Sequence, residues 1–262
     1  MDLGEFELIA RLATRLHGPP AAGAVGIGDD CAALPEGDGF LLLKCDAAFE
    51  NHHFVRGLTP WPDVGWKVAT ANVSDIVTCG GSPVAALVSL GVPQQAAAAE
   101  FEAIYDGLDQ AARAYGFQVL GGNVSAAEQI VVDVFMLGRS PRFIARKGAQ
   151  PGDLLVLSGP VGDSAAGLEE LRERGMSSLA DPLVRRHLRP RARQDLVPAL
   201  LASATAAIDV SDGLAAELHH LAERSAVRLA VERQRIPLSP ELERWSRQRG
   251  RDAIDVALGS GE

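Results

Sequence analysis

Residues 24 to 34 read AVGIGDDCAAL, and in this stretch two adjacent acids, Asp29 and Asp30, follow Gly26 and Gly28. Glycine lets a backbone approach a ligand closely. A loop that binds phosphate unaided uses a helix N-terminus or a lysine rather than two negative charges. Adjacent acids and a phosphate group share a site when a divalent cation lies between them. The stretch therefore predicts a metal-mediated phosphate loop, with an acid-rich turn as the alternative.

The bulk composition predicts an ordered globular protein. The chain has 262 residues, 47% of them hydrophobic and 23% charged, which suits one large domain or two modest ones. The formal net charge is -9, whereas a nucleic-acid binder normally has an excess of basic residues. We therefore expect no nucleic-acid partner. The excess of acidic residues is explained equally well if they keep the protein soluble or if several of them bind metal ions.

The cysteines and the apolar runs bear on the compartment. Cys31, Cys45 and Cys79 match neither a zinc-site nor a disulfide spacing, and reduced thiols suit the cytoplasm. No apolar run approaches the roughly 20 residues of a membrane span, so we expect no membrane partner. Residues 1–16 carry acids among their apolar positions and predict an amphipathic helix rather than a secretory signal.

Strand and helix patterns alternate on both sides of a seam at residues 146–153, which is rich in glycine, proline and charge. Before the seam, the patterns predict strands at 40–46, 84–93, 117–122 and 129–139 and helices at 59–79 and 96–116. After it, they predict strands at 154–160, 206–214 and 226–232 and helices at 162–175, 191–203, 214–225 and 239–250. The alternation favours two α/β domains.

Acidic residues recur where these elements end or a tight turn begins. They are Asp29 with Asp30, Asp46 at the end of its predicted strand, Asp75, and Asp209 with Asp212 in IDVSDGL. Hard cations such as Mg²⁺ take oxygen ligands, usually one or two carboxylates each together with substrate phosphates. Converging acids would hold more than one Mg²⁺ around a nucleotide, whereas each acid alone is explained by turn formation or helix capping.

Other well-known sites fit the chain badly. It has no GxxxxGK[ST] loop and no G-x-S-x-G elbow, and GIGDDC lacks the third glycine of the dinucleotide fingerprint. The histidine pairs at 52–53 and 219–220 lack the H-E-x-x-H spacing of a zinc site. Metal-mediated phosphate chemistry remains the interpretation that the motifs favour.

Ten stretches occur in order along essentially the whole chain. They are GEFELIARL, GIGDDCA, the D-x-x-x-E-x-x-HF pattern of Asp46, Glu50, His53 and Phe54, WKVATANVSDIVTCGGSP, FEAIYDGL, RKGAQPGD, SGPVGDSAAGL, HLRPRAR, AIDVSDGL and the terminal ALGSGE. Together they resemble the thiamine-monophosphate kinase family, whose fold is shared with aminoimidazole-ribonucleotide synthetase. The resemblance implies an α/β (α+β), two-domain PurM-like fold with a mixed sheet flanked by helices in each domain.

The resemblance also implies an activity: ATP-dependent phosphorylation of thiamine monophosphate to thiamine diphosphate by direct in-line transfer assisted by several Mg²⁺ ions. The attacking group is then a phosphate oxygen that is already ionised, so many carboxylates and no strong catalytic base are needed. We therefore assign no residue as a certain catalytic base.

Site residues follow from the matching positions of the family's motifs. As metal ligands the resemblance implies Asp30, Asp46, Asp75, Asp209 and Asp212, with Asp29 as a weaker candidate and Cys45 and Asn123 at positions where the family has ligands. As nucleotide contacts it implies Tyr105, Gly122, Asn123, Arg146 and Ser211, and as contacts of the thiamine substrate His53 and Glu262. Arg146 also makes chemical sense alone, since a guanidinium pairs well with phosphate.

Three departures from the family pattern stand out. GGNVS replaces the usual G-G-D-T-T, so Asn123 offers an amide oxygen in place of an acid. Lys44 and Cys45 stand where Ser or Thr is usual, which removes a hard oxygen ligand and brings a positive charge near phosphate. The chain stops at Glu262, where the family continues, so we expect the second domain to be truncated. The expected domains are residues 1–145, which bind ATP and magnesium and dimerise, and residues 146–262.

Two alternatives stay open. One is another ATP-using member of the superfamily, such as aminoimidazole-ribonucleotide or selenophosphate synthetase, although Cys31 does not lie in the loop context that the latter requires. The other is a nucleotide-binding homologue with reduced turnover, which the departures at Asn123 and Cys45 and the expected truncation after Glu262 motivate. In either case the family implies a homodimer formed through the sheet of residues up to about 140.

Overall fold

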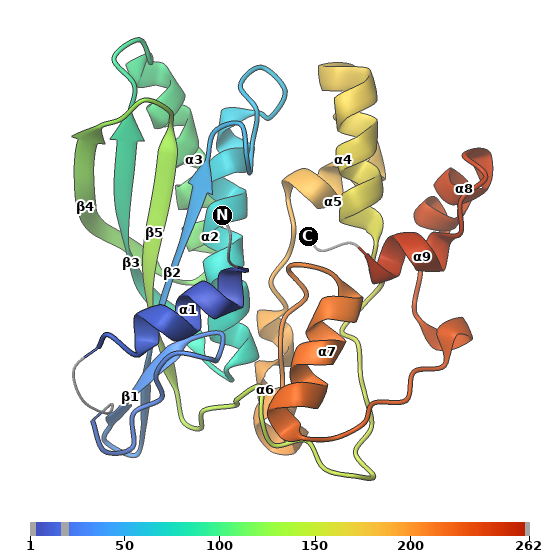
Figure 1. Cartoon of the computed structure of the whole chain (residues 1–262). Helices are drawn as coiled ribbons and strands as arrows, with labels where there is room; N and C mark the ends of the chain where they lie inside the picture. The colour runs from blue at the N-terminus through green and yellow to red at the C-terminus, as the bar shows by residue number, and fades with distance from the viewer. Residues whose placement is uncertain (1–3, 17–20, 260–262) are drawn as a thin grey trace.

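A five-stranded mixed sheet backed by two long helices forms the N-terminal half of the computed structural model, which describes residues 4–16 and 21–259 (Figure 1). The sheet order is β1-β2-β5-β3-β4, and every neighbouring pair is antiparallel except β3 and β4. The elements are α1 (Glu5–Ala13), β1 (Ala32–Glu36), β2 (Gly39–Phe49), α2 (Trp61–Thr78), β3 (Ser82–Val92), α3 (Ala98–Tyr115), β4 (Gln118–Ala126) and β5 (Val131–Ser140). The parallel pair is joined by the helical crossover α3, as such pairs require.

The main hydrophobic core lies between the sheet and α2. On β5, Val132, Val134 and Met136 alternate inward and are fully buried, whereas Phe135 between them is partly exposed. This period of two is that of a strand with one covered face. On α2, Val73 and Ile76 are also fully buried. The apolar pattern of the sequence therefore fixes which side of α2 meets the sheet.

Two glycines let α2 and α3 cross closely. A β-carbon at Gly65 would lie 1.9 Å from the carbonyl oxygen of Ile104, and one at Gly107 would lie 1.8 Å from that of Pro62. Any larger residue at either position would push the helices apart. This close contact fixes α2 on the sheet, and α2 carries Asp75 in its last turn.

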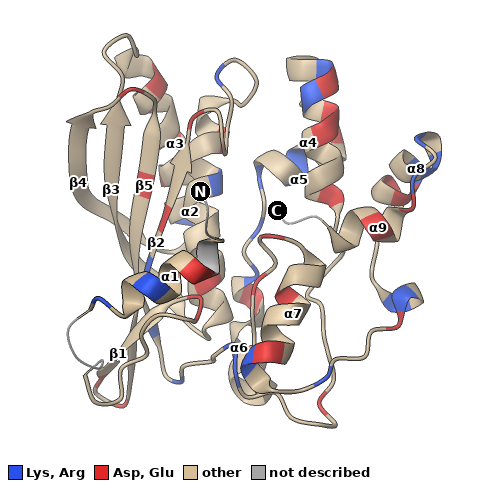
Figure 2. Cartoon of the chain, viewed as in Figure 1, with Lys and Arg blue, Asp and Glu red and all other residues tan. Residues whose placement is uncertain are grey.

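The C-terminal half consists of helices joined by long irregular segments. It contains α4 (Asp163–Arg174), η1 (Gly175–Ser178), α5 (Pro182–Leu188), η2 (Gln194–Leu196), α6 (Val197–Ser203), α7 (Leu214–Ser225), η3 (Arg233–Arg235), α8 (Pro240–Gln248) and α9 (Ala253–Leu258). A second core around Leu214, Leu242 and Trp245 lies in this half. Basic and acidic residues are interspersed on α4 and near α8 (Figure 2), and Arg249 and Arg251 pair there with Glu173 and Glu169.

The mixed α/β class and the mixed sheet are confirmed, but the strands predicted at 154–160, 206–214 and 226–232 are wrong. Among the described residues, no strand follows Ser140. Leu154 and Val156 are 89% and 78% exposed, so their apolar side chains do not face a core. A strand needs a neighbour for its backbone groups, and Ala207, for example, makes a backbone hydrogen bond to Ala145 outside any ladder.

Other boundaries differ in smaller ways. The helix at 214–225 is confirmed, and α3 ends as predicted at Gly116, whose φ of 79° is left-handed. The predicted end of the strand at Asp46 is wrong, because β2 continues to Phe49 and Asp46 lies inside it. No helix in residues 4–16 and 21–259 combines the length and apolar character that crossing a membrane requires.

Candidate active site between the two halves

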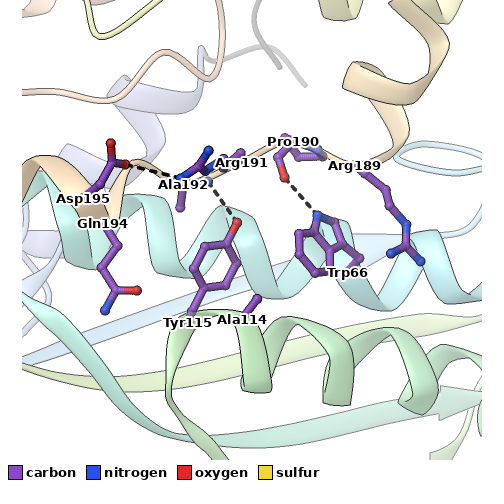
Figure 3. Close-up of a pocket in the computed structure, with 9 residues that line it drawn as sticks. All are labelled: Trp66, Ala114, Tyr115, Arg189, Pro190, Arg191, Ala192, Gln194 and Asp195. Carbon is purple, nitrogen blue, oxygen red and sulfur yellow. Dashed lines mark hydrogen bonds and ion pairs between the residues drawn. The ribbon is translucent and has the colours of Figure 1, made fainter. Parts of the chain in front are cut away.

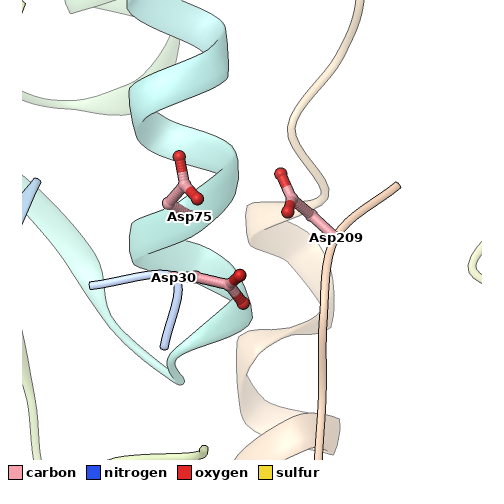
Figure 4. Close-up of side chains that lie close together, drawn as sticks. All are labelled: Asp30, Asp75 and Asp209. Atoms are coloured by element: carbon pink, nitrogen blue, oxygen red, sulfur yellow. The ribbon is translucent and has the colours of Figure 1, made fainter. Parts of the chain in front are cut away.

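Three aspartates from distant parts of the sequence meet where the two halves of the chain face each other. Asp30 lies in the turn before β1, Asp75 in the last turn of α2, and Asp209 in the irregular segment before α7. One carboxylate oxygen from each lies within 4.8 Å of the others, and Figure 4 shows the three side chains converging. Asp30 and Asp75 are buried, and Asp209 is partly exposed.

One oxygen of each carboxylate is held by a neighbouring side chain. Ser74 Oγ donates to Asp209 Oδ2 at 2.9 Å and so ties α2 to the C-terminal half. Lys44 Nζ lies 3.1 Å from Asp75 Oδ2. The guanidinium of Arg146 donates to Asp30 Oδ1 through Nε at 2.7 Å and through a second nitrogen. These contacts orient the acids toward a common point.

Burial and mutual repulsion disfavour the charged forms of these acids. Burial, followed by the charge of Asp209, raises the pKa of Asp30 to about 7, although Arg146 opposes the shift. The same two causes raise the pKa of Asp75 well above its usual value. Burial also raises the pKa of Asp209. A cluster of buried like charges is costly unless a cation joins it.

The donor set fits a hard divalent cation. Carboxylate oxygens are the ligands that Mg²⁺ and Mn²⁺ take in proteins. Asp30, Asp75 and Asp209 offer three of them from three rigidly placed segments, and the raised pKa values are those expected of acids built to share a positive charge.

Asp46 and Cys45, which were both predicted to bind metal, fall on opposite faces of the sheet. In the β2–β5 ladder Asp46 pairs with the buried Val134 on the inner face, and Cys45 pairs with the partly exposed Phe135 on the outer face. Cys45 Sγ contacts Asp133 Oδ1 at 3.1 Å. Burial and then Asp133 raise the pKa of the Cys45 thiol to about 11, which disfavours the thiolate that a metal would need.

Asn123 is also on the outer side. It pairs with Ser89 in the β3–β4 ladder, and Ser89 pairs with Asp133 of β5, so the three residues form one cross-strand row with Ala47 of β2. Asn123 Nδ2 donates to Ser125 Oγ at 3.0 Å. Cys45 is not among the residues that gather with the three aspartates, and Asn123 faces the opposite side of the sheet from them.

The loop before α7 holds Ser211 and Asp212 by their backbones. The amide nitrogens of Ser211 and Asp212 donate to Glu217 Oε1 at 3.4 and 3.0 Å, and Glu217 itself is buried. Both Ser211 and Asp212 are exposed, and Asp212 is not among the clustered acids. Glu217 was not predicted from the sequence, although its position five residues after Asp212, in the following predicted helix, was a usable signal.

Asp29 accepts a hydrogen bond from the backbone nitrogen of Arg146 at 2.6 Å, so the two predicted residues are linked. Asp29 thus serves to join the acidic loop to the segment that follows the sheet.

Of the predicted nucleotide and substrate residues, Arg146 contacts the acidic cluster through Asp30. Tyr105 is partly exposed on α3. Gly122 allows β4 to approach β3, since a β-carbon there would lie 1.7 Å from the carbonyl oxygen of Val88. His53 lies in the loop before α2, where Nδ1 accepts a hydrogen bond from Phe49 N at 3.0 Å and burial lowers its pKa. Glu262 lies outside the described residues.

A cavity of about 670 Å³ lies elsewhere, between α2, α3 and the segment 189–195 (Figure 3). Trp66 Nε1 donates to Pro190 O at 2.9 Å, and Ala192 N donates to Tyr115 Oη at 3.0 Å along its wall. Trp66 is nine residues before Asp75, and at about 100° per residue the two project from opposite sides of α2. The cavity is therefore separate from the acidic cluster.

Two family models match the chain. The model described as AIR synthase related protein, N-terminal domain, matches residues 28–140, and the one described as AIR synthase related protein, C-terminal domain, matches residues 150–257. The chain therefore belongs to the AIR synthase related proteins, as its sheet and acidic cluster suggest.

Full-length relatives narrow the family. The thiamine-monophosphate kinase of Aquifex aeolicus (strain VF5) is 40% identical over 265 residues, covering 100% of this chain and 84% of the relative. That of Bacillus subtilis (strain 168) is 35% identical over 250 residues, covering 92% of this chain and 76% of the relative. The chain belongs to the thiamine-monophosphate kinase family, and it is thereby an enzyme of the phosphotransferase class.

A solved structure agrees. The structure of AaThiL complexed with AMPPCP and TMP superposes with a TM-score of 0.93 at 40% identity, covering 100% of this chain and 83% of that one. The overall fold is thus shared between the two proteins.

Proposed function

We propose that this protein transfers the terminal phosphoryl group of ATP to thiamine monophosphate, giving thiamine diphosphate, and that Mg²⁺ bound at the acidic cluster is required. The observation that carries the proposal is the convergence of Asp30, Asp75 and Asp209 within 4.8 Å. Family membership supports the substrates, since AMPPCP, an ATP analogue, and TMP are the ligands of AaThiL.

The chain's own residues explain how two anions would be brought together. Asp30, Asp75 and Asp209 would hold magnesium, with Asp46 beside them on the inner face of the sheet. When bound, magnesium supplies charge neutralisation for phosphate groups. Arg146 supplies a guanidinium beside Asp30, in reach of an anion that arrives there.

No general base is needed in this proposal. The attacking atom is a phosphate oxygen that is ionised at neutral pH, so the protein has to position and shield charge rather than remove a proton. This agrees with a site made of carboxylates and two cations, Lys44 and Arg146. The outlying candidates Asp29, Asp212, Tyr105, Gly122, Asn123, Ser211 and His53 would contact further metal ions or the ligands only when nucleotide and substrate are bound.

Cys45 and Asn123 favour a second candidate, a nucleotide-binding homologue with reduced turnover. The thiol and the amide give weaker Mg²⁺ ligands than a hydroxyl or an acid in these positions. Restoring the acid with Asn123→Asp should raise the turnover and lower the Mg²⁺ requirement if that ligand is limiting. Unchanged kinetics would argue against a metal beside residue 123.

The decisive experiment follows thiamine diphosphate formation from ATP and thiamine monophosphate with and without Mg²⁺. Asp75→Asn should lower the rate of thiamine diphosphate formation more than about 100-fold, as expected when a charge-neutralising ion is lost from a phosphoryl-transfer site. The control Asp38→Asn, in the exposed turn between β1 and β2, should not change it. Aminoimidazole-ribonucleotide and selenophosphate synthetase substrates serve as a panel for the related activities. ATP binding without any product, or an unaffected Asp75→Asn variant, would refute the proposal.

We further propose a homodimer through the outer face of the sheet. Large apolar side chains are exposed there: Leu87 and Phe135 pair across β3 and β5, and Leu120 on β4 is 66% exposed. Apolar patches of this kind are typical of protein interfaces. Leu87→Glu should convert the protein to a monomer in light scattering, and a wild type that is already monomeric would contradict the proposal.

The domain boundary and the compartment are part of the same proposal. Two domains divided near residues 145 and 146 agree with the two family models and with separate cores around Met136 and Leu242. A cytoplasmic location is supported by ATP as the co-substrate and by three free cysteines.

A further inference from the structure

Lys44 projects from an inner strand of the sheet into the acidic cluster. In the β2–β5 ladder Lys44 pairs with Met136 and Asp46 pairs with Val134, and both β5 partners are fully buried. Alternate residues of a strand face the same side. Lys44 and Asp46 therefore both point to the face that α2 covers, where an uncompensated lysine would be costly.

The ammonium group bridges two carboxylates from different elements. Lys44 Nζ lies 3.3 Å from Asp46 Oδ1 and 3.1 Å from Asp75 Oδ2. The side chain of Lys44 is 19% exposed and that of Asp75 is 8% exposed. A lysine side chain is normally protonated at neutral pH, and the two carboxylates at 3.1 and 3.3 Å favour its charged form.

A divalent ion would use the same two oxygens. Mg²⁺ lies about 2.0–2.1 Å from its oxygen ligands and takes one or two carboxylates with water and phosphate. An ion bridging Asp46 Oδ1 and Asp75 Oδ2 would meet the ammonium group, because both positive charges would occupy the space between the two carboxylates. Like charges at such a distance repel strongly. Ammonium and metal are therefore alternatives at this position.

We propose that Lys44 is a tethered cation that takes the place of one divalent ion between Asp46 and Asp75. The protein then binds one metal ion fewer per chain than it would with a neutral hydroxyl residue at position 44. The other ions remain with Asp30, Asp209 and the second oxygen of Asp75. The inference rests on the proposed magnesium-dependent function and specifies which cation neutralises which acids.

The test counts bound ions and does not depend on activity. Mn²⁺, which takes the same oxygen ligands as Mg²⁺, is titrated in the presence of AMPPCP, and free Mn²⁺ is measured by electron paramagnetic resonance. The variants are Lys44→Thr, which removes the charge and supplies a hydroxyl, and Lys44→Arg, which keeps the charge. Arg113→Thr is the matched control, since Arg113 makes an exposed ion pair with Asp109 on α3.

We expect Lys44→Thr to bind one additional Mn²⁺ per chain, or to bind its Mn²⁺ at least about tenfold more tightly, while Lys44→Arg and Arg113→Thr match the wild type. If Lys44→Thr binds Mn²⁺ with the same stoichiometry and affinity as the wild type, the inference is overturned. If Lys44→Thr binds AMPPCP more weakly and its ion count is unchanged, the inference is also overturned, because Lys44 then contacts phosphate instead. A wild type that binds no Mn²⁺ with AMPPCP would refute the proposed metal chemistry itself, which is a separate result.

Loss of the lysine removes a counterion from a buried acid, so Lys44→Thr is also examined by circular dichroism without metal. If it is unfolded there, added Mn²⁺ should restore the folded signal, because a divalent ion can take the position of the ammonium group. Failure to fold at saturating Mn²⁺, while Lys44→Arg folds, would overturn the inference.

Discussion

Replacing Asp209 by asparagine should make the metal-free protein more stable and at the same time prevent magnesium from stabilising it. The amide oxygen that Asp209→Asn introduces would still accept the hydrogen bond that Ser74 Oγ now donates to Asp209 at 2.9 Å. What disappears is the negative charge that faces Asp30 and Asp75 with oxygens within 4.8 Å. Stability would rise because that charge costs free energy in the folded state only.

The structure gives the magnitude. Two full charges 4.8 Å apart repel by about 3.5 kcal/mol at an effective dielectric constant of about 20. Asp209 faces two acids, but the positive charges of Lys44 and Arg146 attract it and offset part of this repulsion. We therefore expect the free energy of unfolding to increase by about 2 kcal/mol at a pH of about 8.

The pH dependence gives a second signature. The pKa of Asp209 is raised by burial in the folded state, so its ionisation destabilises the wild type increasingly as the pH rises above the ordinary value of 3.8. At a pH of about 4 a larger share of Asp209 is protonated in the folded state than in the unfolded chain, so the gain from asparagine should be smaller than at the alkaline pH. A saturating ligand at about 100 times its Kd stabilises by about 2.7 kcal/mol, so excess Mg²⁺ should make the wild type the more stable of the two under the alkaline condition.

The assay is urea unfolding followed by tryptophan fluorescence at the acidic and the alkaline pH, with EDTA or with excess MgCl₂. Asp38→Asn, which removes a charge in the exposed β1–β2 turn, is the control and should change the free energy of unfolding little in every condition. The reasoning is refuted if Asp209→Asn is less stable than the wild type at the alkaline pH in EDTA, or if Mg²⁺ stabilises both proteins equally.

Three further outcomes are expected. Mg²⁺ affinity measured by calorimetry should fall about tenfold per pH unit below about pH 7, because Asp30, with its pKa of about 7, must lose its proton to bind metal; a Kd that stays constant across neutral pH would contradict this. Arg146→Gln should lower the free energy of unfolding by about 3 kcal/mol in urea, since it leaves Asp30 buried without its guanidinium, and a change below about 1 kcal/mol would show that the pair is not needed. Gly122→Ala should lower the melting temperature by several degrees, because a β-carbon there would lie 1.7 Å from Val88 O, whereas Gly159→Ala, with nothing nearer than 3.9 Å, should change it little.

Features of the fold that depend on nearby residues could be predicted from the amino-acid pattern. Periodicity and punctuation placed the helix at 214–225 and the end of α3 at Gly116 correctly, since helix formation and a left-handed cap are local matters. The ten motifs that occur in order along the chain indicated its resemblance to the thiamine-monophosphate kinase family. The paired acids after two glycines predicted a metal-mediated site before any contact was known.

Which distant residues come into contact depends on how the whole chain packs. Asp209 lies far along the chain from Asp75, and no local pattern shows that their oxygens come within 4.8 Å. The register of β2 with β5 places the side chains of the adjacent residues Lys44 and Cys45 on opposite faces of the sheet, because successive side chains of a strand point to opposite sides. The segment at 154–160 has the apolar composition of a strand but no ladder, since a strand requires a partner that the local sequence does not specify.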